Sequence, residues 1–416
     1  MSRRIGILAG PYPVDDQLGG IGLRLWEMAQ VLADAGHRVT ICAPRASDFT
    51  HPGVSVVAGG EKETVAASDA VITTDLPDTQ LLLDAYERGT LLIAENAPPI
   101  EHLHFDAFTG SGAEVEALYR DTVARWRLQL LLSDHLLVRS EAERASTLGA
   151  LVAAGRMSAL HHRAGADLAD LVSLVPIGYN RHSLHTADTA AAREDAECEV
   201  LWNGGVWDYC RPDPVLLALA ADPTSAFRLR LLYAPPPDRL EGLLARADDL
   251  GVAERVLLPE EPVAHRARDG WVKAARAVVI TGERTAENMT CHRLRLRDAA
   301  LYRLPVVVDG YGATGDLVAA LGIGPVIDPN HPQALAAALR HAACDGSERD
   351  GYLAALDTAR SPRHGRFALE RHLAPLLHLL ESGHRAPDRT DRHHQAAIHT
   401  LLTCHPGLRE QAPAVI

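Results

Sequence analysis

Two kinds of segment alternate along the chain. Short apolar, β-like runs such as residues 4–9 and 38–43 are separated by longer stretches in which apolar residues recur at helical spacing. In residues 23–36, for example, Leu25 and Leu32 fall on one helical face, and a glycine ends the pattern. Strands that alternate with helices in this way predict a parallel sheet covered on both faces.

The alternation runs through the first part of the chain and then begins again. The further strands predicted in the first series are residues 54–57, 70–73, 91–94 and 135–138. A polar, alanine-rich stretch, residues 182–197, is interpreted as a linker. The second series of predicted strands is 199–202, 229–233, 256–258, 277–281, 306–308 and 325–328.

We therefore predict an α/β protein with two doubly wound domains and a cleft between them. The first domain spans residues 1–180 and the second spans residues 181–365. Residues 366–416 form a helical, histidine- and arginine-rich segment that we expect to cross back to the first domain.

Charged and polar side chains gather in residues 283–310, directly before a buried strand. They are Glu287, His292, Arg293, Arg295 and Asp298. A loop, a helix and a buried strand in this order place such groups at the rim of a parallel sheet, where α/β proteins bind ligands. Carboxylates there can accept hydrogen bonds from sugar hydroxyls, and arginines can bind a diphosphate. The segment predicts a sugar-nucleotide site.

Composition narrows the class of protein. The chain has 416 residues, 47% hydrophobic and 23% charged, which is typical of a folded globular protein of two or three domains. Its net charge of −13 argues against a general nucleic-acid-binding protein, which would carry a basic stripe. This charge still permits a local positive pocket for a phosphate.

The cysteines and the apolar runs indicate a cytoplasmic protein. The six cysteines are scattered without a Cys-x-x-Cys pair, so neither a disulfide framework nor a zinc pattern is predicted. The apolar N-terminal run is too short for a signal peptide. No run reaches the ~18–20 apolar residues of a membrane span, so no integral membrane segment is expected.

Several segments, taken in order, resemble one enzyme family. They are residues 19–22, 32–40, 148–156, 201–209, 303–307, 321–325 and 328–329. Together they are similar to the GT-B glycosyltransferases of the retaining, group 1 type, in a subgroup seen in polysaccharide and natural-product clusters. The resemblance covers residues 4–345. It implies two Rossmann-like domains facing across a cleft, with the nucleotide-sugar donor bound by the second domain and the acceptor by the first.

The same resemblance implies roles in the second domain. In this subgroup a Glu, an Arg-x-Arg and an Asp precede a turn, and Glu287, Arg293, Arg295 and Asp298 fill those places. Glu287 would lie near the transferred sugar and Asp298 would accept hydrogen bonds from the donor ribose. The two arginines would neutralise the leaving diphosphate. The alternative for Asp298 is a surface helix acid paired with Arg295 or Arg297.

The chain departs from the wider family at two places. The family has two glutamates eight residues apart, whereas Thr290 stands eight residues before Asp298. The usual Arg and Lys pair after the glycine turn of the second domain is missing, and only Arg211 is available there. No Asp-x-Asp motif is placed to hold a metal and diphosphate, so we predict that no metal is needed. Thr290 and His292 complete the donor-side candidates, with packing as the alternative for His292.

Two glycine-rich segments are further donor-binding candidates. Gly19, Gly20 and Gly22 precede a predicted helix whose N-terminal amides could bind a diphosphate. The alternative is a loop that needs positive φ angles. Beyond the strand at 199–202 the candidates are Asn203, Gly204, Gly205 and Trp207. Backbone amides in that turn can donate to phosphate oxygens, and the tryptophan either stacks on the donor or packs in the core.

Acceptor-side candidates follow the strand at 91–94. They are Glu95, Asn96, His102 and His104. Glu95, His102 or His104 could position an acceptor hydroxyl or accept its proton, with His102 taken as the catalytic candidate. The alternative is a proline-rich turn with exposed histidines.

The expected function is transfer of a sugar from a nucleoside-diphosphate donor, of GDP or UDP type, to a small polar acceptor in bacterial natural-product or polysaccharide biosynthesis. No protein nucleophile is evident, so retention would follow from same-face substitution with the leaving phosphate as base. No cofactor is expected, and a homodimer is left open. The alternatives are another GT-B enzyme, namely a sugar-nucleotide epimerase or a phosphorylase-like protein, and a non-catalytic sugar-nucleotide-binding partner of a transferase.

Overall fold

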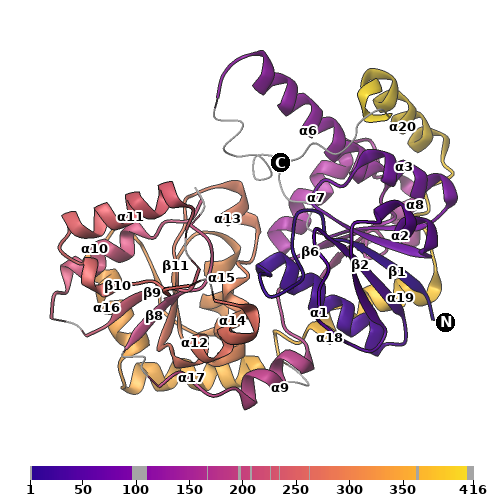
Figure 1. The fold of residues 1–416 in the computed structure, drawn as a ribbon. Coiled ribbons are helices and arrows are strands. Elements are labelled where there is room, and N and C mark those ends of the chain that lie inside the picture. Colours follow the sequence, from indigo (N-terminus) through magenta and orange to yellow (C-terminus); the bar gives the residue numbers. More distant parts are fainter. Residues whose placement is uncertain are drawn as a thin grey trace. The chain divides into compact units, whose positions relative to one another are not determined.

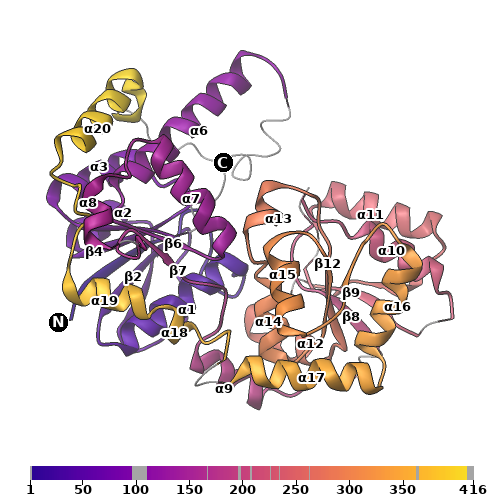
Figure 2. The same cartoon turned by 180° about the vertical axis from the view of Figure 1, so that it is seen from behind.

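The computed structural model describes most of the chain. The described residues are 2–95, 110–165, 167–194, 198–206, 209–224, 226–233, 235–261, 263–361 and 365–409. They divide into two compact units (Figures 1 and 2). One unit comprises Met1–Pro176 together with Leu369–Ile416, and the other is Ile177–Ala368.

The first unit is built on a seven-stranded parallel sheet of order β3-β2-β1-β4-β5-β6-β7. Its strands are β1 (Arg4–Leu8), β2 (Arg38–Ala43), β3 (Val54–Ala58), β4 (Ala70–Thr74), β5 (Leu91–Glu95), β6 (His135–Val138) and β7 (Val172–Leu174). In the register, Ile7 of β1 lies opposite Ile41 of β2 and Ile72 of β4. All three side chains are fully buried, as expected for strands whose two faces are both covered by helices.

Helices from both ends of the chain cover this sheet. They are α1 (Gly20–Asp34), α2 (Glu61–Ala67), α3 (Thr79–Arg88), α6 (Ala113–Leu132), α7 (Glu141–Ala153), α8 (Ala159–Ala164), α18 (Leu369–His372), α19 (Ala374–Ser382), α20 (Arg392–Cys404) and a 3-10 turn at Pro406–Arg409. Met28 of α1 and Leu376 of α19 share one apolar cluster with β1, whereas Leu128 of α6 and Leu401 of α20 belong to another. Gly36, with φ 93°, follows α1 as predicted.

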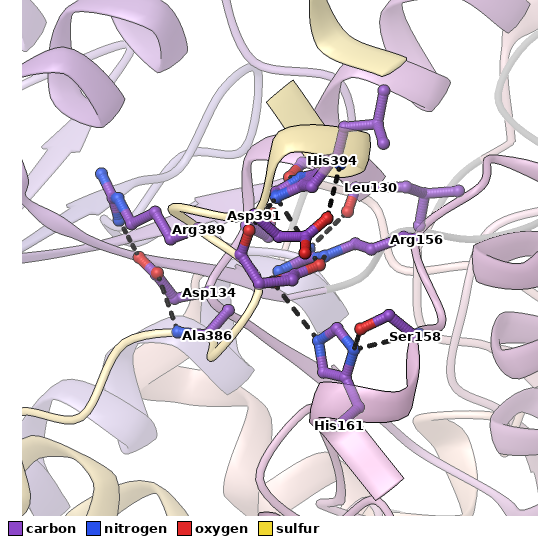
Figure 3. Close-up of polar contacts among 12 residues, drawn as sticks. Leu130, Asp134, Arg156, Ser158, His161, Ala386, Arg389, Asp391 and His394 are labelled. Atoms are coloured by element: carbon purple, nitrogen blue, oxygen red, sulfur yellow. Dashed lines mark hydrogen bonds and ion pairs between the residues drawn. The ribbon is translucent and has the colours of Figure 1, made fainter. Parts of the chain in front are cut away.

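Buried ion pairs attach the C-terminal segment to the rest of its unit (Figure 3). The Asp388 carboxylate lies 3.3 Å from Nε of Arg156 and 3.3 Å from Nε2 of His161. Nearby, Arg389 Nη1 lies 2.6 Å from the Asp134 carboxylate, just before β6. These acids and Arg156 are almost entirely buried. Loss of one partner would leave a buried charge uncompensated, which is strongly destabilising.

The second unit contains a six-stranded parallel sheet of order β10-β9-β8-β11-β12-β13. Its strands are β8 (Glu199–Trp202), β9 (Arg228–Leu231), β10 (Val256–Leu257), β11 (Ala277–Ile280), β12 (Val306–Asp309) and β13 (Val326–Ile327). Val278 of β11 lies opposite Leu201 of β8 and Val306 of β12. In both sheets the strand order reverses beside the first strand, as in Rossmann domains, and a crevice for ligands is expected at that switch point.

The helices of the second unit correct one prediction. They are α9 (Arg181–Thr189), α10 (Asp213–Ala221), α11 (Pro237–Asp249), α12 (Arg268–Ala274), α13 (Ala286–Thr290), α14 (Arg295–Tyr302), α15 (Gly312–Leu321), α16 (Pro332–Ala343) and α17 (Ser347–Arg360), with 3-10 turns at Ala253–Arg255 and His265–Ala267. The linker predicted at 182–197 is wrong for its first half, which is helix α9. Asn180 caps this helix by accepting from Ser183 N at 2.9 Å, and Ala187 packs into the core.

The prediction of two doubly wound α/β domains is confirmed. None of the helices within the described ranges is long and apolar enough to cross a membrane.

Candidate functional site

The candidate site lies at the carboxyl ends of β11 and β12, beside the switch point of the second sheet. The residues after these strands and the segment between α13 and α14 line a cavity there. The residues that line this cavity include Tyr209, Cys210, Gly282, Arg293, Arg295 and Asp309. This is the edge at which open α/β sheets bind ligands.

Arg293 and Glu287 form a close ion pair at this cavity. Arg293 Nη1 lies 2.6 Å from Glu287 Oε1, and the two side chains are only 12% and 8% exposed. The Arg293 guanidinium also stacks 4.6 Å from the ring centroid of Tyr209. Its Nη2 is buried and has no hydrogen-bond partner among the described residues. The structure therefore brings together the two predicted residues and leaves one buried guanidinium nitrogen of Arg293 without a protein acceptor among the described residues.

Arg295 is held rigidly beside the glycine turn that follows β8. Its Nη2 donates to Gly205 O at 2.9 Å and to the sulfur of Cys210 at 2.9 Å. Its guanidinium carbon lies 4.3 Å from the ring centroid of Trp202. A Cβ on Gly204 would lie 2.4 Å from Arg295 Nε, so only glycine leaves room for the guanidinium at this distance. The predicted turn and the predicted arginine are in direct contact.

Asp298 is buried among protein partners. Arg297 Nη1 lies 2.5 Å from its Oδ1, while Asn203 Nδ2 lies 2.8 Å from its Oδ2, which also accepts from Arg268. Burial alone would raise the pKa of Asp298, but Arg268 and Arg297 outweigh it and lower the pKa. The carboxylate is therefore ionised and holds Asn203, the first residue of the glycine turn. Its contact with the donor ribose stays a prediction.

Sequence reasoning missed Arg268. This arginine is almost fully buried, and it lies in α12, which is remote in sequence from α14. Nothing in the spacing of α12 indicates a partner, because the contact with Asp298 depends on how the two helices pack.

Thr290 and His292 lie within the short connection around α13. Thr290 Oγ1 donates to Ala286 O at 2.9 Å, a bond within the helix, and both Thr290 and His292 are buried. Beside them, the backbone N–H of Arg293 donates to Thr314 Oγ1 at 2.9 Å. Thr314, at the start of α15, thus fixes the backbone from which Arg293 extends.

Asp309 is a second residue that the sequence prediction omitted. It ends β12, and its carboxylate accepts from Gly282 N at 2.8 Å and from Tyr311 N at 3.2 Å. Burial raises the pKa of Asp309, although the two backbone hydrogen bonds oppose that shift. Its position directly after a run of three valines was the signal that could have identified it.

In the first unit, Glu95 is bound within the protein. Its carboxylate oxygens lie 2.6 Å and 3.3 Å from Nε and Nη2 of Arg24, and both side chains are almost fully buried. Arg24 also donates to Val175 O at 2.8 Å and to Pro176 O at 3.1 Å. The other acceptor-side candidates, Asn96, His102 and His104, lie outside the described residues, as does Trp207.

One of the three glycines at the start of α1, Gly22, has a packing role that the sequence did not indicate. Gly19, Gly20 and Gly22 all lack positive φ angles, so the alternative of a loop needing positive φ is wrong here. A Cβ on Gly22 would lie only 2.2 Å from Pro13 O, so this glycine allows the preceding loop to approach the helix. Gly19 is the N-cap, and the first turn of α1 has no acidic residue that would compete for an anion.

Comparison with known proteins identifies the fold. A scan against protein-family models and a search of curated proteins find no match to this chain. Among solved structures, sucrose-phosphate synthase from Thermosynechococcus elongatus is similar, with TM-score 0.61, 14% identity, and coverage of 92% of this chain and 100% of that chain. HepE from Anabaena in complex with UDP is similar with TM-score 0.63, 15% identity, and coverage of 92% and 100%.

A third similar structure is AviGT4, a glycosyltransferase involved in avilamycin A biosynthesis. Its TM-score is 0.57 at 16% identity, and the likeness covers 96% of this chain and 98% of that chain. At such identities the likeness establishes the fold. The chain has the GT-B fold of two Rossmann-like α/β domains, as the sequence predicted.

Proposed function

We propose that the chain is a glycosyltransferase that moves a sugar from a nucleoside-diphosphate donor, with retention and without a metal. The observation that carries the proposal is the pair formed by the partly buried Arg293 and the buried Arg295, which line one cavity at the sheet switch point beside Glu287. The GT-B fold and its similarity to solved structures of glycosyltransferases support it.

The arginines supply what a departing diphosphate needs. Negative charge accumulates on the leaving phosphates as the glycosidic bond breaks, and fixed donors in a partly dehydrated site stabilise it most. Arg295 is held in place by Trp202 and Gly205, so little reorganisation is needed on binding. Arg293 offers the buried Nη2 that has no hydrogen-bond partner within the described structure. Both groups therefore suit a diphosphate.

The acids take separate roles in this proposal. Glu287 positions Arg293 and lies near the transferred sugar, while Asp298 holds Asn203 and the glycine turn. No step through a protein nucleophile is proposed. The leaving phosphate acts as the base for the acceptor hydroxyl on the same face of the sugar.

The donor type, the acceptor and the cellular location are expectations drawn from the same resemblance. We infer a UDP- or GDP-type donor, and the similar HepE structures, which contain UDP or UDP-glucose, support the UDP type. We also infer a small polar acceptor in bacterial natural-product or polysaccharide biosynthesis. The likeness to AviGT4, which is involved in avilamycin A biosynthesis, supports a natural-product pathway. Cytoplasmic location is part of the proposal.

A thermal-shift panel of UDP, GDP, ADP and dTDP tests the proposal. A nucleotide that binds the folded state raises the melting temperature, and a tighter-binding nucleotide raises it further at the same concentration. We expect UDP or GDP to raise it for the natural protein and the shift to be lost in Arg293→Ala. Arg246→Ala, which removes an exposed arginine paired with Asp213 in the same unit, is the matched control and should keep the shift. No shift with any of the four nucleotides would reject the proposal.

A further inference from the structure

Asp309 is an acid of the cavity at the carboxyl ends of β11 and β12. It ends β12 and lines the cavity together with Arg293 and Arg295. Among the described residues that line this cavity, it is the only aspartate or glutamate. Glu287 and Asp298, the acids that the sequence predicts for the donor, are not among these lining residues. Of the three acids, Asp309 is therefore the one that is placed to contact a ligand in the cavity.

Arginines already neutralise the two predicted acids. Arg293 Nη1 lies 2.6 Å from Glu287 Oε1, and Asp298 forms ion pairs with Arg268 and Arg297. Breaking a buried ion pair leaves its charges uncompensated, which is costly. These two carboxylates are therefore poorly suited to exchanging a guanidinium for a neutral hydroxyl group of a ligand.

Asp309, by contrast, has only neutral partners among the described residues. Its Oδ2 accepts from Gly282 N at 2.8 Å, and its Oδ1 accepts from Tyr311 N at 3.2 Å. Burial raises the pKa of Asp309, whereas two arginines lower the pKa of Asp298. A carboxylate offers about four acceptor positions, so Asp309 keeps acceptor capacity for hydroxyl groups of a ligand.

The backbone around Asp309 is closely packed. A Cβ on Gly282 would lie 2.6 Å from Asn288 Nδ2, which donates to Tyr209 O at 2.9 Å. A Cβ on Gly312, which has φ 74°, would lie 2.1 Å from Asn288 O. Both glycines therefore allow the segments after β11 and β12 to approach Asn288. This packing holds the two amide donors of Asp309 in place, so the carboxylate is preorganised for a ligand.

We propose that Asp309 is a specificity-determining residue that accepts a hydrogen bond from a hydroxyl group of the nucleotide sugar in this cavity. The inference rests on the proposed function, because it concerns a ligand of the same site. The hydroxyl belongs either to the donor ribose or to the transferred sugar, and in both cases an O–H donates to a carboxylate. A ligand that lacks this hydroxyl leaves a buried acceptor without its donor and binds more weakly.

The two sources of the hydroxyl are distinguished by two sets of ligands, with affinities measured by calorimetric titration. The ribose set is UDP with its 2′-deoxy and 3′-deoxy forms. The sugar set is UDP-glucose, UDP-galactose and UDP-N-acetylglucosamine. If GDP is the nucleotide that binds, the corresponding guanosine compounds, with GDP-mannose and GDP-fucose, take their place. We expect the natural protein to prefer one ligand about tenfold within one set.

Asp309→Asn should remove that preference, because it keeps the size of the side chain but loses its charge and one acceptor oxygen. A purely structural role would weaken all ligands alike and leave the preference unchanged. Asp316→Asn is the matched control, because Asp316 is an exposed aspartate of α15 in the same unit. This variant should keep the preference of the natural protein, and circular dichroism shows whether each variant is folded.

Two results would overturn the inference while leaving the proposed function intact. One is a natural protein that binds all members of both sets equally well, a result that requires no variant. The other is an Asp309→Asn protein that keeps the full preference of the natural protein. Failure of every nucleotide and nucleotide sugar to bind the natural protein would instead reject the proposed function, and this inference with it.

Discussion

Each unit of the molecule contains a glutamate–arginine pair at the carboxyl edge of its sheet, almost fully buried in the first unit and partly buried in the second, and the two arginines differ in how many of their nitrogens the protein uses. In the first unit, Arg24 donates from Nε and both Nη nitrogens to Glu95 and to two backbone carbonyls. In the second unit, Arg293 binds Glu287 through Nη1 and keeps Nη2 without a hydrogen-bond partner among described residues, in a cavity.

The number of guanidinium nitrogens that the protein uses distinguishes an ion pair that supports the fold from one that can bind a ligand. An arginine whose three guanidinium nitrogens all donate within the protein, as those of Arg24 do, has little to offer a ligand. An arginine that is buried beside a cavity with a donor to spare carries a cost that a bound anion can offset. The predictions below separate the ion pairs that support the fold from the pair that binds the donor.

The largest expected effect is on the free energy of unfolding of Arg24→Met. The change leaves the Glu95 carboxylate buried without its cation, and breaking a buried pair in this way costs about 3–5 kcal/mol. Urea unfolding measures the loss, and the double variant Arg24→Met/Glu95→Gln should recover part of it. Equal stability of the natural protein and Arg24→Met would show that the pair does not support the fold.

Acid should weaken the attachment of the C-terminal segment. Arg156, His161 and His394 outweigh the effect of burial and lower the pKa of Asp388 to about 2, below the ~3.9 of an unfolded aspartate. A lowered folded-state pKa contributes stability that is present above the unfolded value and is lost as pH falls through the folded value. The loss is about 2 kcal/mol between about pH 4 and pH 2.

Unfolding of the natural protein and of Asp388→Asn, measured across that range, isolates this contribution. The natural protein should lose more stability than the variant as the pH falls. Parallel curves for the two proteins would contradict the assignment.

Much of the fold could be predicted from sequence because its strands are continuous apolar runs. The strands at 38–43, 135–138 and 199–202 have the predicted bounds. The sequence analysis missed helix α9 because most of its residues are polar. Ala187, which packs into the core, is its buried residue.

The site was harder to predict than the fold, for a physical reason. The approach of Arg295 to Gly204 and the pairing of Arg24 with Glu95 join residues that are far apart in sequence and meet through tertiary packing. Chemical type and order along the chain could identify Glu287, Arg293 and Arg295 as a group. They could not show which guanidinium nitrogens the protein itself uses.

Removing either side chain of the second pair, Glu287 or Arg293, should have a smaller effect, and this effect should be on catalysis. Glu287→Ala and Arg293→Ala should each reduce the rate of sugar transfer by more than tenfold, a threshold of about 1.4 kcal/mol on the barrier. The reason is the loss of a group that stabilises or positions the leaving diphosphate. Steady-state rates with the donor found in the thermal-shift panel measure the effect. Near-normal rates in both variants would refute the site assignment.

The smallest expected effect is that of a chelator. The proposal assigns charge neutralisation at the diphosphate to Arg293 and Arg295, so EDTA should leave the transfer rate unchanged. Loss of activity that only Mg²⁺ restores would contradict this part of the account.

Calorimetric titration of the natural protein with the nucleoside diphosphate selected by the panel, alongside Arg293→Ala and Arg24→Met, tests the central claim most directly. The account predicts that Arg293→Ala weakens binding at least tenfold while Arg24→Met, measured where it is folded, keeps the affinity of the natural protein. Equal affinity of the natural protein and Arg293→Ala would contradict the claim that this arginine binds the donor diphosphate.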